Sequence, residues 1–117
     1  MSQNKLTYQD FEIEQLKENY SFRNQSEVLE FIDNNSSLLP LLQESTEKIR
    51  RFFPNTPLIL TVATNTETAS REKMLLILIA SDMESENLLG KLLELDSEWG
   101  GKVEYESHGK MLINLGY

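Results

Sequence analysis

An unbroken apolar run at residues 74–80, MLLILIA, constrains the fold more than any other stretch of this chain. It is too short for a typical helix, and a second apolar run at residues 58–64 precedes it. The pair predicts two strands joined by a polar link at residues 65–72. Because side chains alternate along a strand, residues 74–80 present apolar groups on both faces. Each face therefore needs a cover, from this chain or from another.

Helical periodicity before the two runs predicts a helical hairpin. A first helix is expected to begin at Ser26, a residue type that caps helix N-termini well. A second is expected from residue 38 to Phe53, because Pro54 disfavours helical geometry in the residue before it. Pro40 falls in the first turn of this second helix, where its missing N–H costs nothing.

The strongest helix prediction covers residues 83–99. Leucines at helical spacing form one apolar stripe that closes on Trp99, and Gly100 with Gly101 is expected to end the helix. The stripe contains Leu88, Leu92 and Leu95 and is widened by Leu89 and Leu93. Beyond the glycines, the alternation at residues 111–115 predicts a final strand, with residues 103–105 pairing with it across a turn at 106–109.

This element order predicts an α+β fold: a helical hairpin, a β-hairpin, a helix and a C-terminal strand, with helices packed on a mainly antiparallel sheet. Residues 26–117 are expected to form one domain. Residues 1–25 are predicted to be an accessory segment: a weak helix, a short edge strand, or a segment ordered by a partner. Helices on one face of the sheet, with partial dimer cover on the other, are the favoured arrangement.

Composition excludes several functional classes. The chain has 11 Lys and Arg against 19 Asp and Glu, a net charge of -8, which opposes binding to the phosphates of nucleic acids. It has no cysteine, which removes thiolate catalysis and cysteine-based metal sites. No apolar run approaches the ~20 residues that span a bilayer, and the N-terminus lacks a signal-peptide core. We expect a cytoplasmic protein with no nucleic-acid or membrane partner.

Asp96, Glu98 and Trp99 form the most conspicuous cluster of candidate site residues. Paired carboxylates can act as acid and base, but residues two apart on a helix point away from each other. A solvated helix face beside a core tryptophan is therefore favoured, with a contact role for all three as the alternative.

The remaining candidates are His108, Arg50 and Arg51. His108 is the only histidine, and without cysteine or a second histidine it predicts an exposed turn residue rather than a metal ligand. Arg50 and Arg51 lie near a helix C-terminus, where cations are favourable, and could alternatively bind an anion or a partner. No catalytic, metal or cofactor site is expected.

Three sequence blocks carry a resemblance to known proteins: FIDNNSSLLPLLQESTEKIRRFFPNTPLIL, LLGKLLELDSEW and GKMLINLGY. They resemble a group of small prokaryotic proteins, found especially in cyanobacteria, that have no established biochemical function. The resemblance covers about residues 28–117. It implies a shared fold with these motifs at core and cap positions, and it implies no catalytic residues.

The sequence leaves three hypotheses for function. The favoured one is an acidic, non-enzymatic protein-interaction module, either an accessory subunit or an antitoxin-like or immunity-like inhibitor of a partner. The second is a ligand-binding or enzymatic domain with a pocket between helices and sheet, using Asp96, Glu98 and His108. The third is a structural homodimer associated through an exposed sheet edge or face.

Overall fold

The computed structural model describes residues 8–64, 72–80 and 86–116 of the chain. The polar link at residues 65–71 and the expected helix cap at residues 81–82 lie outside this part. The elements in chain order are α1 (Tyr8–Asn19), β1 (Tyr20–Phe22), α2 (Gln25–Asn34), α3 (Leu38–Phe52), β2 (Leu58–Thr64), β3 (Lys73–Ile79), α4 (Glu86–Leu95), the π-helix η1 (Asp96–Gly100), α5 (Gly101–Glu106) and β4 (Met111–Leu115).

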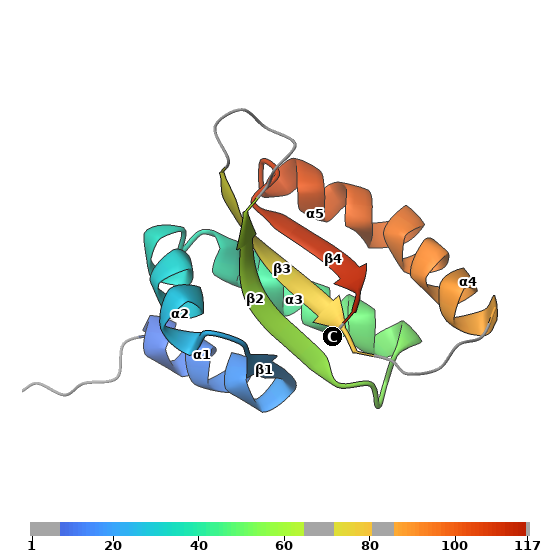
Figure 1. Cartoon of the computed structure of the whole chain (residues 1–117), viewed down its shortest axis with the longest axis horizontal. Coiled ribbons are helices and arrows are strands. Elements are labelled where there is room, and N and C mark those ends of the chain that lie inside the picture. Colours follow the sequence, from blue (N-terminus) through green and yellow to red (C-terminus); the bar gives the residue numbers. More distant parts are fainter. Residues whose placement is uncertain (1–7, 65–71, 81–85, 117) are drawn as a thin grey trace, which may run out of the picture.

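The strands form one sheet in the order β1-β2-β3-β4 (Figure 1). The α+β prediction is confirmed, but the expected mainly antiparallel pairing is wrong. Only β2 and β3 pair antiparallel, whereas β1 with β2 and β3 with β4 pair parallel. The reason is that helices connect each parallel pair, and such a crossover returns the chain to run in the same direction.

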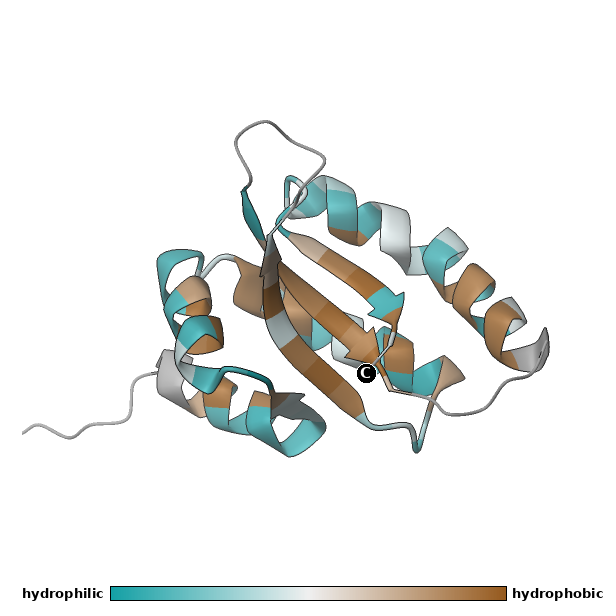
Figure 2. Ribbon diagram, viewed as in Figure 1, coloured by the Kyte–Doolittle hydropathy of each residue, from teal (hydrophilic) through white to brown (hydrophobic). Residues whose placement is uncertain are grey.

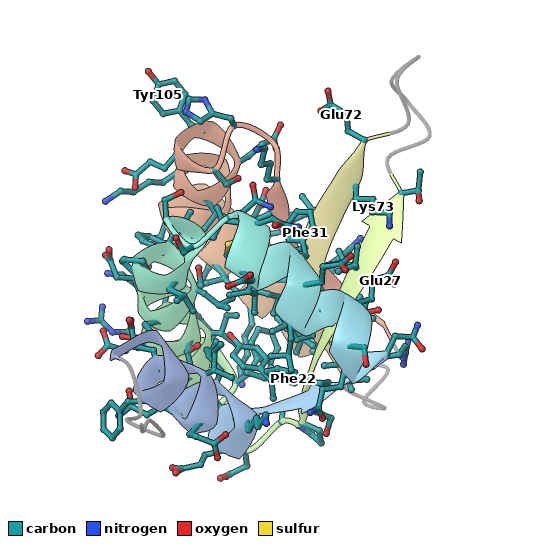
Figure 3. The ribbon with its side chains drawn as sticks, turned by 90° about the vertical axis from the view of Figure 1, so that its left-hand side faces the viewer. Phe22, Glu27, Phe31, Glu72, Lys73 and Tyr105 are labelled. Carbon is teal, nitrogen blue, oxygen red and sulfur yellow. The ribbon has the colours of Figure 1, made fainter. Side chains whose placement is uncertain are left out.

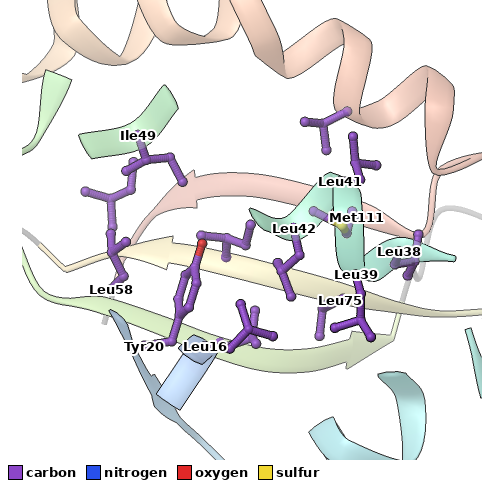
Figure 4. Packing of buried hydrophobic residues seen from close by; sticks show 14 of the residues in the cluster. Leu16, Tyr20, Leu38, Leu39, Leu41, Leu42, Ile49, Leu58, Leu75 and Met111 are labelled. Carbon is purple, nitrogen blue, oxygen red and sulfur yellow. The ribbon is translucent and has the colours of Figure 1, made fainter. Parts of the chain in front are cut away.

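The helices pack on one face of this sheet (Figure 3). Side chains of alternate strand residues reach into the space between the layers, and Leu60, Leu75 and Ile77 are completely buried there. Figure 4 shows residues of α1, α3 and the strands meeting in this core, including Leu16 and Tyr20. The arrangement with helices on one face therefore agrees with the expectation from the sequence.

The first part of the chain belongs to the same core. Leu16 of α1 and Tyr20 of β1 are buried, and β1 aligns with β2 so that Tyr20 lies opposite Leu58. The segment expected to be accessory thus contributes a covering helix and an edge strand. Ile13 and Phe22 also pack against this core, so four side chains anchor the segment.

The helical hairpin follows the prediction with a different start. Asn24, in the left-handed conformation with φ 57°, precedes α2, so Ser26 lies inside the helix rather than capping it. The second helix, α3, ends as expected just before Phe53 and Pro54.

An ion pair connects β3 to α2. Nζ of Lys73 and Oε2 of Glu27 lie 3.3 Å apart, and both side chains are partly exposed (Figure 3).

The largest departure from prediction is at Gly100 and Gly101. Both have right-handed helical geometry, and the chain passes from α4 through η1 into α5 without a stop. The strand predicted over residues 103–105 is therefore wrong, because these residues lie in α5. Buried Leu95, Trp99 and Val103 are four apart. An α-helical turn has only 3.6 residues, so side chains four apart drift around an α-helix. The wider π turn compensates for this drift and keeps all three side chains directed at the core.

Candidate functional site

Trp99, the most prominent candidate, lies in the core. Its ring is 3 % exposed, and its Nε1–H donates to Oγ of Ser45 in α3 at 2.8 Å. The ammonium groups of Lys48 and Lys102 lie 5.6 and 5.1 Å from the ring centroid. Two cations this close to one indole ring favour a fixed ring position. Trp99 therefore joins the C-terminal helices to α3, in agreement with the core prediction.

Asp96 and Glu98 are exposed on η1. A Cβ added to Gly100 would meet the Oδ1 atom of Asp96, so the Asp96 carboxylate folds back over its own helix. Among the described residues, no contact joins Asp96 or Glu98 to His108. The carboxylates do not form a paired acid–base site.

The two arginines have different environments. Arg50 Nη1 donates to the carbonyl oxygens of Phe53 at 3.1 Å and Thr56 at 2.7 Å. It therefore caps α3 and holds the turn that leads into β2. Arg51 is exposed and remains accessible to a partner.

His108 lies in the turn between α5 and β4, as predicted. It is exposed and has φ 55°, and Gly109 follows with φ 77°. It borders an open hollow of about 610 Å³ together with Tyr105, which is 82 % exposed. In the described part of the chain, no group of three acidic or histidine side chains converges as a metal site would require.

Two further hollows lie on the helical side. One of about 220 Å³ separates α1 from α3, and another of about 310 Å³ lies between β1 and the turn after α3. Neither includes Asp96, Glu98 or His108. The space between helices and sheet, where a pocket was one hypothesis, is filled by the apolar core.

Tyr20, which was not singled out in the sequence, borders the second of these hollows. Thr46 Oγ1 donates to the Leu42 carbonyl at 2.9 Å, so its 2.7 Å contact with Tyr20 makes the tyrosine the donor. Burial raises the pKa of Tyr20 from 10.0 to about 12, and the Arg50 charge opposes this only in part. A neutral, buried phenol whose O–H group already donates a hydrogen bond suits a structural role.

The feature with the clearest potential for contacts is the sheet face turned away from the helices, which we call the open face. Figure 2 shows that the three longer strands are mostly hydrophobic along their length. The register gives the open face eight side chains on the three longer strands, and no described helix packs on them. They are Ile59, Thr61 and Ala63 of β2, Met74, Leu76 and Leu78 of β3, and Leu112 and Asn114 of β4.

Burial distinguishes the two faces. On β3, Leu75, Ile77 and Ile79 of the helical side are completely buried, whereas Met74 and Leu76 of the open face are half-buried. Thr61 and Leu78 of the open face are buried as well, at 7 % and 8 % exposed. None of the eight side chains is charged, in a chain whose net charge is -8.

The free edge of β4 is largely blocked by its own chain. Leu75 N–H donates to the Lys110 carbonyl and Gly116 N–H to the Ile79 carbonyl, so the odd-numbered residues of β4 direct their backbone groups outward. The outward N–H of Met111 donates to Ser107 Oγ at 3.0 Å. That of Leu115 donates to Asn114 Oδ1 at 2.8 Å.

These two bonds leave Ile113 as the only residue of β4 with an outward N–H not bonded to a side chain. At the opposite edge, β1 has only three residues. Short strands and occupied edge donors are ways in which sheets avoid pairing with other chains. The sheet thus offers a partner its face rather than its edges.

None of the helices in the described residues has both the length and the apolarity needed to cross a bilayer. Comparisons with protein-family models, with curated proteins and with solved structures find no match to this chain. The resemblance to small prokaryotic proteins therefore stays a prediction.

Proposed function

We propose that this chain is a non-enzymatic protein-interaction module that uses the open face as its contact surface. It would act as an accessory subunit or as an inhibitor of a partner. The observation that carries the proposal is the contrast between a helical side whose central residues are completely buried and a mostly apolar, uncharged open face that no described helix covers.

The energetics favour a partner on this face. Burying apolar surface contributes roughly 25 cal/mol per Å², and the open face lets a partner bury the exposed parts of five apolar side chains without desolvating a charge. These partly exposed side chains are Ile59, Ala63, Met74, Leu76 and Leu112. The acidic surface around the module would keep it soluble.

The hypothesis of a ligand-binding or enzymatic domain has less support. Asp96 and Glu98 face solvent, His108 lies in a separate turn, and the described hollows are shallow. The hollow beside His108 is bordered by Glu104 and Tyr105 but by neither of the other two candidates. No observation favours a substrate there.

Photo-crosslinking in the organism that encodes the chain tests the proposal. A photoreactive phenylalanine analogue at Leu76 should give a discrete adduct, because Leu76 lies centrally on the open face. The same analogue at Leu89, which is 55 % exposed on α4, is the matched control and should give only background. If Leu76 and Leu89 give the same pattern, the proposal is wrong.

A further inference from the structure

We infer that the partner on the open face is a second copy of the chain, packed face to face about a two-fold axis in a weak, reversible dimer. The inference rests on the proposed function and names its partner. Three properties of the open face carry it: its lack of charge, the blocked edges beside it, and its size.

The lack of charge permits self-association. A two-fold axis places each patch against its own copy, so a charged patch would face like charges. None of the eight open-face side chains is charged, and Thr61 and Asn114 are the only polar ones among them. Such a surface has no charge to complement a strongly charged partner. Two copies of it can face each other without repulsion between like charges.

The blocked edges determine the geometry. Edge-to-edge association would need free outward N–H groups on β4, and Met111 and Leu115 already donate theirs within the chain. Two copies can instead stack their sheets at the ~10 Å separation typical of packed sheets, with side chains of both open faces interdigitating.

The size of the face determines the strength. Strands spaced by ~4.8 Å, with a rise of ~3.3 Å per residue, give β2, β3 and β4 a footprint of ~300–400 Å². Stable complexes bury about 800 Å² per partner. The dimer is therefore weak, with a dissociation constant between about 10 µM and 1 mM.

Sedimentation equilibrium of the purified full-length chain, from about 1 µM to 1 mM, tests this inference. The mass should rise from that of the 13.5 kDa monomer towards twice that value. Leu76→Lys and Met74→Lys, both on the open face, should remain monomeric throughout. Leu89→Lys makes the same chemical change on α4 and should associate like the wild type.

Each lysine also reduces the net negative charge, which by itself would favour association. Loss of the dimer in the two open-face variants would therefore reflect the face and not the charge. Near-UV circular dichroism of Trp99, on the helical side, checks that the variants fold. If both variants fail to fold, NMR chemical shifts of the wild-type backbone amides, recorded at increasing protein concentration, test the inference instead. The amides that shift should belong to open-face residues such as Ile59 and Leu112.

A wild-type chain that stays monomeric up to 1 mM overturns the inference. Association that persists in both open-face variants, or amide shifts that map elsewhere, also overturns it. A monomeric chain whose Leu76 crosslinks to a different protein would leave the proposed function standing without self-association. A self-adduct from Leu76, at twice the chain mass, would support the dimer and the open face as a contact surface, and it would count against the role of accessory subunit or inhibitor.

Discussion

Two polar pairs, one buried and one part-buried, show how single residues fix this fold. Tyr20 with Thr46 joins β1 to α3, and Trp99 with Ser45 joins η1 to α3. Each pair places a hydrogen bond within an apolar core, where an unpaired polar group is costly. Both anchor distant parts of the chain to one helix.

Tyr20 should make stability depend on alkaline pH. Between the unfolded pKa of 10.0 and the folded pKa of about 12, the unfolded state has lost the phenolic proton and the folded state keeps it. The folded state then binds more protons, so the free energy of unfolding falls as pH rises. Below pH 10 both states keep the phenolic proton, so the free energy of unfolding does not depend on pH through Tyr20. We expect a loss of about 2–3 kcal/mol by pH 12.

Denaturant titrations from pH 9 to 12 measure this loss. Tyr20→Phe should remove that part of the pH dependence, because phenylalanine has no proton to lose. Tyr105→Phe, at a tyrosine that is 82 % exposed, is the matched control and should keep the wild-type slope. Equal slopes in wild type and Tyr20→Phe would contradict the assigned pKa.

Ser45→Ala should destabilise the chain by about 1–3 kcal/mol, because it leaves the buried Trp99 N–H without an acceptor. Urea unfolding followed by circular dichroism measures the change. In a Trp99→Phe background the same substitution should cost much less, since phenylalanine has no N–H to satisfy. An equal cost in both backgrounds would show that the hydrogen bond contributes nothing.

At the scale of elements, the continuous α4–η1–α5 segment shows how a π turn keeps a buried stripe aligned. Leu95, Trp99 and Val103 face the core, whereas Leu89 and Leu93 are 55 % and 61 % exposed. The predicted stripe is therefore narrower than the leucine pattern indicated, because Leu89 and Leu93 of α4 do not belong to its buried part. The glycines inside this segment are helical, so they cost backbone entropy without serving as a stop.

Gly101→Ala should stabilise the chain by up to about 1 kcal/mol. An added Cβ there meets nothing within 4 Å, φ is -63°, and alanine restricts the unfolded chain. Gly100→Ala should gain less, because its Cβ would displace the Asp96 carboxylate. Thermal unfolding compares the two variants.

The double variant Asp96→Ala, Gly100→Ala provides the control for this difference. Removing the carboxylate should restore the gain that Gly100→Ala alone lacks. If Gly100→Ala is as stabilising as Gly101→Ala, the contact with Asp96 has no energetic weight.

At the scale of the whole molecule, a strongly negative chain carries an uncharged open face, which we propose as its contact surface. Two copies with a net charge of -8 each repel at a distance, and salt screens that repulsion. Self-association should therefore strengthen as NaCl rises from about 20 to 500 mM. Sedimentation at fixed protein concentration measures the dimer fraction. Weakening with salt would instead indicate attraction between opposite charges.

Strand positions followed from local pattern, but their pairing did not. Residues 58–64 and 111–115 alternate or run apolar as strands do, and the structure has strands at both places. Parallel pairing depends on how helices return the chain, a tertiary property that no local spacing encodes. The first strand, three residues long, is too short to leave a periodic signal.

The candidate residues show the same contrast between what local sequence predicts and what depends on tertiary structure. The core position of Trp99 and the turn position of His108 followed from spacing and from neighbouring residues. The capping role of Arg50 depends on carbonyl groups of Phe53 and Thr56 brought close by a turn. Blocking of the β4 edge by Ser107 and Asn114 likewise depends on the tertiary structure, because serine and asparagine near a strand predict only a turn.

The connection between β2 and β3 divides the chain into two fragments, each with a parallel strand pair and its linking helices. Ser45 belongs to the first fragment and Trp99, the only tryptophan, to the second. Chains cut within residues 65–71 and expressed separately should reassemble by rebuilding β2 against β3. The emission of Trp99 would shift as its indole leaves water for the site beside Ser45, giving the protein a built-in optical signal for complementation.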